Sequence, residues 1–181
     1  MQPHATFSKQ FKIFFGLAIV VKLILLVVFS SGYQEGLFIP FVLDFLEYGG
    51  NPWEYQSAVK EVFPYPPLML YILSIALSPL QYLDPEVNSY IIAKGLLYGL
   101  PLFLADLIIT VILIRMFIWH KKEVFVFYFI SPIILFSTYM HGQLDIIPTA
   151  ILFSSIFLLS KNHYLLSAII AGLAISTKFH T

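Results

Sequence analysis

The chain has 181 residues, of which 59% are apolar, 17% aromatic and only 11% charged. A soluble domain of this length carries more charge on its surface, and long apolar stretches recur along nearly the whole sequence, so we expect an all-α polytopic membrane protein. The formal net charge is zero, which argues against nucleic acid as a partner. The absence of cysteine excludes disulfides, thiolate chemistry and cysteine metal sites.

About five apolar segments are predicted to cross the bilayer and to form a single transmembrane module over residues 1–181. Beyond Lys12 at its start, the first is apolar except for Lys22 and has no small-residue cleavage site, so it is interpreted as a retained anchor and not as a signal peptide. Residues 68–83 are also apolar, but this segment is short and interrupted by Pro79, which is typical of an interfacial segment. It belongs to the predicted external loop, residues 30–88. The predicted spans are residues 11–29, 89–119, 124–140, 146–159 and 164–179.

Charged residues predict the orientation of this module. If residues 68–83 do not span, the basic residues gather on one side and the acidic residues on the other. The positive-inside rule then places the N-terminus in the cytoplasm and the acidic loops outside. If residues 68–83 did span, the Arg115–Lys122 cluster would move outside and the bias would be lost. The basic set is Lys9, Lys12, Arg115, Lys121, Lys122 and Lys161, and the acidic set is Glu35, Asp44, Glu47, Glu54, Glu61, Asp84, Glu86 and Asp145.

A helix is predicted in the first external loop over residues 37–48, where Pro40 suits the first turn. Asp44, Glu47 and Tyr48 are spaced i, i+3 and i+4, so they share one face of that helix. A carboxylate held just outside the bilayer beside apolar surface can serve as a general base. The alternative is that this face is only the solvated edge of an amphipathic interfacial helix, and the spacing alone does not decide between the two.

The second external loop, residues 141–145, is also polar. Its short flanking spans would leave the loop near headgroup depth, where His141, Gln143 and Asp145 are costly unless they have partners, which favours a site. His141 and Asp145 could join Asp44 around a divalent cation, but no metal-ligand spacing is present in the sequence. No cofactor is therefore assigned, and a divalent cation is left as an alternative.

Three further features each have a functional and a structural interpretation. Residues 63–68 are rich in proline and aromatic residues, so they could shape a groove for a lipid chain or only redirect the chain. Asp106 lies inside the second predicted span, where we expect it to be protonated and hydrogen-bonded to a Ser, Thr or Tyr of a neighbouring helix. Lys178 ends the last span, and it could attract a lipid phosphate or only extend to the interface.

Taken in order, these motifs resemble the N-terminal conserved module of the GT-C superfamily of polyprenyl-phosphate-sugar-dependent glycosyltransferases. The resemblance is to the bacterial mannosyltransferase-like branch and to the dolichol-phosphate-sugar enzymes of the endoplasmic reticulum, and it covers nearly the entire chain. The motifs that carry it are a first span followed by Asp44, Gly49-Gly50-Asn51-Pro52-Trp53, Tyr65-Pro66-Pro67-Leu68, Ala105-Asp106-Leu107, Ser131-Pro132, Gly142-Gln143-Leu144-Asp145 and Lys178.

This resemblance implies an activity and a location. The chain would transfer a sugar, with inversion, from a polyprenyl-phosphate donor to an extracytoplasmic acceptor, in the bacterial inner membrane or the endoplasmic reticulum. Juxtamembrane helices would lie in the first external loop. Asp44 would be the catalytic base, and Asp145 would be a second catalytic residue that orients the acceptor. The implied substrate-binding residues are Glu47, Tyr65, His141, Gln143 and Lys178.

Members of this superfamily continue for several more spans. The chain is therefore expected to be the N-terminal part of a longer enzyme, half of a split enzyme, or a module used for assembly. A non-enzymatic scaffold that binds other membrane subunits is the main alternative, and a transporter has less support because polar residues do not line several spans. We also expect Asp145 close to Asp44, in one cleft walled by Tyr65 and Trp53. The alternative is that Asp145 only caps the helix that follows it.

Overall fold

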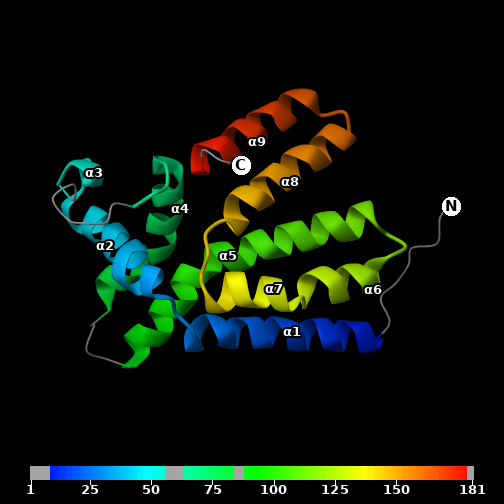
Figure 1. The fold of residues 1–181 in the computed structure, drawn as a ribbon, viewed down its shortest axis with the longest axis horizontal. Helices are drawn as coiled ribbons and strands as arrows, with labels where there is room; N and C mark the ends of the chain where they lie inside the picture. The colour runs from blue at the N-terminus through cyan, green and yellow to red at the C-terminus, as the bar shows by residue number, and fades with distance from the viewer. Residues whose placement is uncertain (1–8, 56–62, 84–87, 179–181) are drawn as a thin grey trace.

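The computed structural model describes residues 9–55, 63–83 and 88–178, and all regular structure in these ranges is helical (Figure 1). The all-α prediction is thereby confirmed for this part of the chain. Helices α1 (Lys9–Val28) and α5 (Asn88–Met116) are both long and apolar. A third apolar stretch of helix, Lys121–Met140, is assembled from four shorter pieces. These are α6 (Lys121–Val124), η4 (Phe125–Phe129), α7 (Pro132–Ile134) and η5 (Leu135–Met140).

These three helices have the length and composition needed to cross a membrane, and the structure supports three of the five predicted spans in this way. The other two correspond to α8 (Ile146–Ser160) and α9 (Tyr164–Thr177), which have 15 and 14 residues. At a rise of 1.5 Å per residue, such helices extend roughly 20 Å, less than the hydrocarbon thickness of a typical bilayer of about 30 Å.

The third apolar helix is irregular for an identifiable reason. Pro132 has no amide hydrogen, and Ser131 before it has an extended ψ of 130°, so the helix is interrupted there. The segments on both sides, η4 and η5, are π-helical, with hydrogen bonds such as Ile130 N to Phe125 O and His141 N to Phe136 O that span five residues. A π-helical turn accommodates one more residue than an α-helical turn.

Two glycines let α1 and α5 approach each other closely. A Cβ atom on Gly95 would lie 2.7 Å from the carbonyl oxygen of Leu26, and one on Gly99 would lie 2.5 Å from the Leu26 side chain. The spacing of four residues between these glycines is that of the small-residue motif by which membrane helices bring their backbones together. The contact between α1 and α5 therefore requires glycine at Gly95, where the opposing atom belongs to the backbone.

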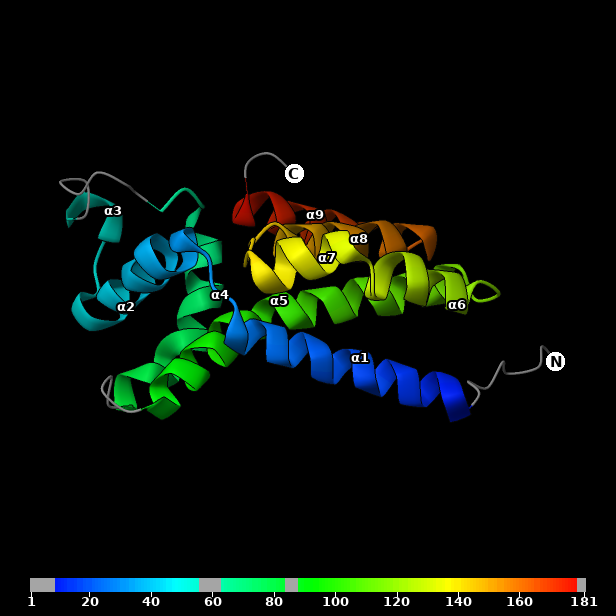
Figure 2. The ribbon, with the colours of Figure 1, turned by 60° about the horizontal axis from the view of Figure 1, so that its bottom comes forward.

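The long helices lie side by side, and the described parts of the predicted external loop fold across one end of them (Figures 1 and 2). The start of α1, the end of α5, the start of α6 and the turn between α8 and α9 lie together at the other end. The first loop forms η1 (Gln34–Phe38), α2 (Ile39–Tyr48), α3 (Pro52–Tyr55), α4 (Pro67–Leu77) and η3 (Ser78–Tyr82). Helix α4 runs across the direction of α1 and α5 in both views, so it is not a member of the bundle.

The six basic residues of the predicted cytoplasmic set belong to the four helix ends at the far end of the bundle. The described acidic residues of the opposite set belong to the end that carries α2 and α4. Three residues of that acidic set, Glu61, Asp84 and Glu86, lie outside the described residues. The described residues of the two sets therefore lie at opposite ends of the bundle, and the sides of the membrane that they face stay a prediction.

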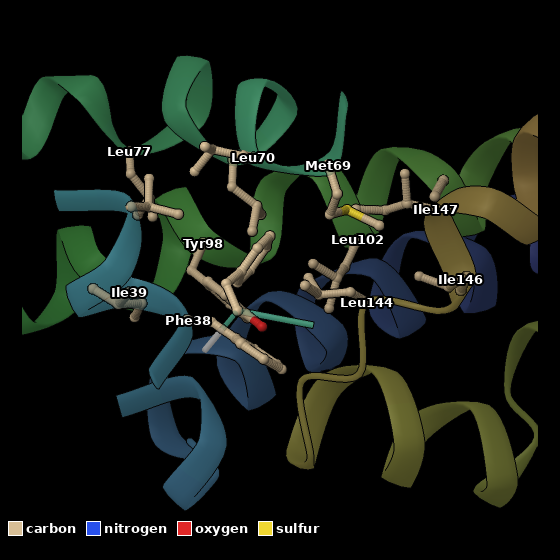
Figure 3. Packing of buried hydrophobic residues seen from close by; sticks show 14 of the residues in the cluster. Phe38, Ile39, Met69, Leu70, Leu77, Tyr98, Leu102, Leu144, Ile146 and Ile147 are labelled. Atoms are coloured by element: carbon tan, nitrogen blue, oxygen red, sulfur yellow. The ribbon is translucent and has the colours of Figure 1, made fainter. Parts of the chain in front are cut away.

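The apolar core lies where α2, α4 and α5 meet the beginning of α8 (Figure 3). Met69 and Leu73 of α4, Leu102 of α5 and Leu144 before α8 are fully buried. Val42 of α2 is also fully buried, so the apolar side of this short helix packs against protein and not against the membrane. This core holds the loop elements firmly against α5 and so positions the polar residues above it.

Candidate functional site

Asp145 lies at the centre of a small polar cluster. The Lys178 ammonium donates a hydrogen bond of 2.7 Å to Asp145 Oδ1, and the Tyr65 hydroxyl donates one of 3.3 Å to the same oxygen. The three residues come from the end of α9, the segment before α4 and the start of α8. Helix α9 packs against both α8 and α4, and this packing brings the three side chains together.

The loop that carries Asp145 has a conformation that requires glycine. Gly142 has a φ of +66°, and a Cβ atom there would lie 2.6 Å from Oε1 of Gln34. The buried Tyr98 hydroxyl donates a hydrogen bond of 2.8 Å to the Gly142 carbonyl oxygen, and Gln143 N donates one to Ser137 O. These contacts fix the loop on α5 and η5, so the orientation of Asp145 is built into the fold.

The structure contradicts the interpretation of Asp145 as a helix cap. Asp145 occupies the N-cap position of α8, but its carboxylate makes no hydrogen bond to the backbone amides of that helix. Its oxygen accepts from Lys178 and Tyr65 instead. About half of the Asp145 side chain is exposed, at 48%, so this ion pair contributes at most about 1 kcal/mol to stability. The position of the carboxylate is therefore better explained by a site than by helix stability.

Two cavities meet at Asp145. The first, of about 220 Å³, has a mixed lining that is more polar than that of the second, and it is called the polar cavity below. Its lining includes Tyr33, Phe38, Tyr65, His141, Gln143 and Asp145. The second, of about 290 Å³, is a mainly apolar groove between α5, the third apolar helix and α8. Its lining includes Ile109, Leu113, Ile134 and Phe153, and it also contains Gln143 and Asp145. The Gln143 amide and the Asp145 carboxylate therefore lie at the junction of the polar cavity and the apolar groove.

An aromatic cluster shapes the wall of the polar cavity. The ring of Phe63 stacks on Phe41 with centroids 5.0 Å apart and meets Phe38 edge-on at 5.7 Å. The Trp53 indole nitrogen donates a hydrogen bond of 3.2 Å to the Phe63 carbonyl oxygen. These contacts hold the proline-rich segment in place, with Tyr65 over the cavity. Pro64 and Tyr65 of this segment line the polar cavity, whereas no residue of 63–68 lines the apolar groove, so a role of this segment in holding a lipid chain stays a prediction.

The Tyr65 phenol is kept protonated by its surroundings. Partial burial raises the pKa of Tyr65 well above its usual value, and the negative charge of Asp145 and the hydrogen bond to it raise the pKa further. Tyr65 is therefore a permanent hydrogen-bond donor to Asp145 in the physiological pH range.

Asp44 and Glu47 lie on α2, away from this cluster. Glu47 and Asp44 both raise the pKa of the exposed Tyr48, Glu47 mainly through a hydrogen bond and Asp44 through its charge, as expected if the three share one face. Neither carboxylate lines the polar cavity or the apolar groove. The physical reason is that α4 packs against both α2 and α9, so it lies between Asp44 and Lys178. The structure thus brings together Tyr65, His141, Gln143, Asp145 and Lys178 and leaves Asp44 and Glu47 outside.

A metal centre built from Asp44, His141 and Asp145 is not formed. Among the residues that the structure describes, no three His, Asp or Glu side chains come close enough to hold a metal ion.

The sequence analysis missed a buried ion pair between α1 and α5. Asp106 is bonded to the Tyr139 hydroxyl, as expected of a hydroxyl on a neighbouring helix, but it also binds the Lys22 ammonium. Lys22 lies over the Phe129 ring as well, 3.4 Å from its centroid. The signal was present in the sequence, since Lys22 and Asp106 are the charges nearest to the middle of two predicted spans, and charges at membrane depth generally pair with one another.

Comparisons of the chain with protein-family models, with characterised proteins and with solved structures give no match. The chemistry of the site is therefore inferred from its own residues.

Proposed function

We propose that the chain is a membrane-embedded glycosyltransferase, or the membrane module of one, that transfers a sugar from a polyprenyl-phosphate donor to an extracytoplasmic acceptor with inversion. The observation that supports it is the position of Asp145 and Lys178 at the junction of a polar cavity and an apolar groove. A lipid-linked sugar needs both environments, with the isoprenoid chain in the groove and the sugar in the polar cavity.

Each residue of the cluster has a role in this proposal. The Lys178 ammonium opposes the negative charge that develops on the departing lipid phosphate. His141 and Gln143 line the polar cavity and hydrogen-bond to sugar hydroxyls. Asp145 holds Lys178 in place and orients the substrate together with Tyr65. None of these proposed contacts requires a metal ion, and a divalent cation is the alternative partner for the phosphate.

Asp44 is proposed as the general base. It takes the proton of the acceptor hydroxyl as that oxygen attacks the anomeric carbon, and the bond from this carbon to the phosphate oxygen breaks. Asp44 lies on α2 and lines neither cavity, so this role requires Asp44 to approach the polar cavity when the acceptor binds, because a general base must reach the hydroxyl that attacks the anomeric carbon. Glu47 on the same face of α2 would contact the acceptor as well.

The proposal includes five spans with the N-terminus in the cytoplasm. The charge asymmetry of the bundle supports it, because the basic residues gather at the end formed by the start of α1 and the end of α5. Helices α8 and α9 would then cross a locally thinned bilayer, which holds the loop with Asp145 at headgroup depth.

A non-enzymatic scaffold is the second candidate. Asp145 is neutralised by Lys178, and the buried charges of α1 and α5 neutralise each other, which is also what a purely structural cluster requires. Such a chain would use its apolar outer surface to bind other membrane subunits.

Transfer by the intact protein distinguishes the candidates. The protein is reconstituted in lipid nanodiscs with a polyprenyl-phosphate-mannose donor, and release of the lipid phosphate is measured. Asp44→Asn should lower the rate by about 10²–10⁴, the usual contribution of a general base, while Glu123→Gln at the opposite end should be neutral. If Asp44→Asn kept the wild-type transfer rate while Glu47→Gln lost it, Glu47 and not Asp44 would be the general base. Absence of transfer in the wild type, with membrane subunits co-purifying, would favour the scaffold.

A further inference from the structure

A second amphipathic groove lies between α1 and α5, at the end of the bundle opposite to the polar cluster. It has a volume of about 380 Å³ and is lined by Phe11, Lys12, Phe15, Val111, Ile114 and Arg115. The start of α1 and the end of α5 that form it lie together in Figure 1. Four of the six lining side chains are apolar, and the other two are cations.

The groove has a defined direction. Lys12 and Arg115 lie toward the ends of their helices, while Phe15 and Val111 lie about one turn further into the bundle. The positive charges are therefore at the mouth of the groove, and apolar surface continues inward from them. This is the polarity of a site for a lipid, whose charged headgroup lies at the membrane surface and whose chain extends inward.

The aromatic wall of the groove is supported from behind. Phe11 meets Phe125 of η4 edge-on with centroids 5.3 Å apart, and Phe15 stacks on Phe129 at 4.6 Å and 12°. Because η4 fixes both rings on their far side, the wall is formed before any ligand binds. A preformed wall lowers the cost of ordering side chains on binding.

Within the part of the chain that the structure describes, the two cations at the mouth have no acidic partner. Both Lys12 and Arg115 are exposed, and in residues 9–55, 63–83 and 88–178 neither forms an ion pair. Glu123, the acidic residue nearest to Arg115 in sequence, contacts His120. Two unopposed cations at the mouth of an apolar groove complement one negative headgroup and one hydrocarbon chain.

We propose that this groove binds an anionic phospholipid of the surrounding leaflet. The phosphodiester lies between Lys12 and Arg115, and an acyl chain lies along Phe15 and Val111. Basic pockets between membrane helices bind anionic headgroups in this way, and the guanidinium of Arg115 can hold two phosphate oxygens at once. The site is separate from the polar cluster around Asp145 and does not depend on the proposed glycosyl transfer.

Lipid binding to the full chain tests this site. The detergent-purified protein is titrated with dioleoylphosphatidylglycerol or dioleoylphosphatidylcholine, and bound lipid is counted by native mass spectrometry. We expect phosphatidylglycerol to bind at least tenfold more tightly than phosphatidylcholine. The double variant Lys12→Gln/Arg115→Gln should lose about tenfold or more of that affinity, since each cation near an anionic headgroup contributes to binding.

Two controls separate the groove from general surface charge. Lys122→Gln/Lys161→Gln removes the same charge at the same end of the bundle but outside the groove, and should keep the wild-type affinity. Val111→Trp fills the groove without changing charge, and should weaken binding while leaving helicity by circular dichroism unchanged. Equal binding of the two lipids, equal losses in the two double variants, or wild-type affinity in Val111→Trp would each overturn the proposal.

Discussion

The Lys22 ammonium on α1 lies 2.5 Å from a carboxylate oxygen of Asp106 on α5, and both side chains are completely buried. The same oxygen accepts a hydrogen bond from Tyr139 of η5, so three helices of the bundle meet at one carboxylate. Charges at this depth are costly alone and are tolerated as a pair. This cluster therefore fixes the relative rotation of α1, α5 and the third apolar helix.

Removal of one partner from this pair should destabilise the protein strongly. Lys22→Met leaves the Asp106 carboxylate without its cation and should cost about 3–5 kcal/mol of unfolding free energy. The double variant Lys22→Met/Asp106→Leu should recover most of that loss, because no charge is left buried. Unfolding in mixed detergent micelles, followed by circular dichroism, measures both values. If Lys22→Met were at least as stable as the double variant, the Lys22–Asp106 pair would not be required for stability.

Close packing of α1 on α5 makes Gly95 sensitive to the smallest addition. Gly95→Ala would place a methyl group 2.7 Å from the Leu26 carbonyl oxygen, so the helices must separate, at a cost of about 1–3 kcal/mol. Gly172→Ala in α9 is the matched control, since nothing lies within 4 Å of its added methyl group. That control should be neutral or stabilising by up to about 1 kcal/mol, because alanine favours a helix. Similar changes in thermal stability for the two variants would contradict this packing argument.

Orientation can be measured by cysteine labelling, because the chain has no cysteine of its own. With a membrane-impermeant maleimide applied to intact cells, Asn51→Cys should label from the extracytoplasmic side. Lys121→Cys should label only after the cells are permeabilised. Labelling of Lys121→Cys in intact cells would overturn the five-span proposal and the sidedness of the site.

The protonated phenol of Tyr65 predicts a loss of stability at alkaline pH. Its pKa is raised in the folded protein, whereas a tyrosine in the unfolded chain ionises near about pH 10. The hydrogen bond to Asp145 therefore contributes fully to the unfolding free energy below about pH 10. This contribution is lost as the pH rises further and the phenol ionises in the unfolded chain. Wild-type unfolding free energy should fall more steeply than that of Tyr65→Phe above about pH 10. Tyr82→Phe, at an exposed residue outside the cavity, should keep the wild-type slope, and an unchanged slope in Tyr65→Phe would contradict the prediction.

Apolar runs were sufficient to predict the long helices. The lengths of α1 and α5 follow from predominantly apolar sequence, and the short length of residues 68–83 together with Pro79 predicted that this segment lies outside the bundle. The polar loop around Gly142 was also expected to be a site, because its short flanking helices leave it near the membrane surface. Local sequence pattern and segment length are therefore sufficient to predict the long helices and the position of a polar loop between two short ones.

Long-range relationships could not be predicted from the same patterns. Lys22 and Asp106 are 84 residues apart, and their pairing depends on the rotation of α1 against α5, which the two glycines determine. The separation of Asp44 from Asp145 depends on the position of α4, and no periodicity specifies which neighbours such a helix has. The π-helical turns have no compositional signal either, since their residues would equally suit an α-helix.

The π-helical segment η5 changes what a deletion in this part of the gene would do. In an α-helix each residue turns the chain by about 100°, and η5 holds surplus residues relative to an α-helix of the same rise. Loss of one codon within Leu135–Met140 would let the segment relax to an α-helix of nearly the same length. The span would survive, and the residues after it, such as Gly142, would keep nearly the same facing, because a π-helix turns the chain less per residue than an α-helix. A one-residue deletion in this segment can therefore be absorbed without reorienting the loop that carries Asp145.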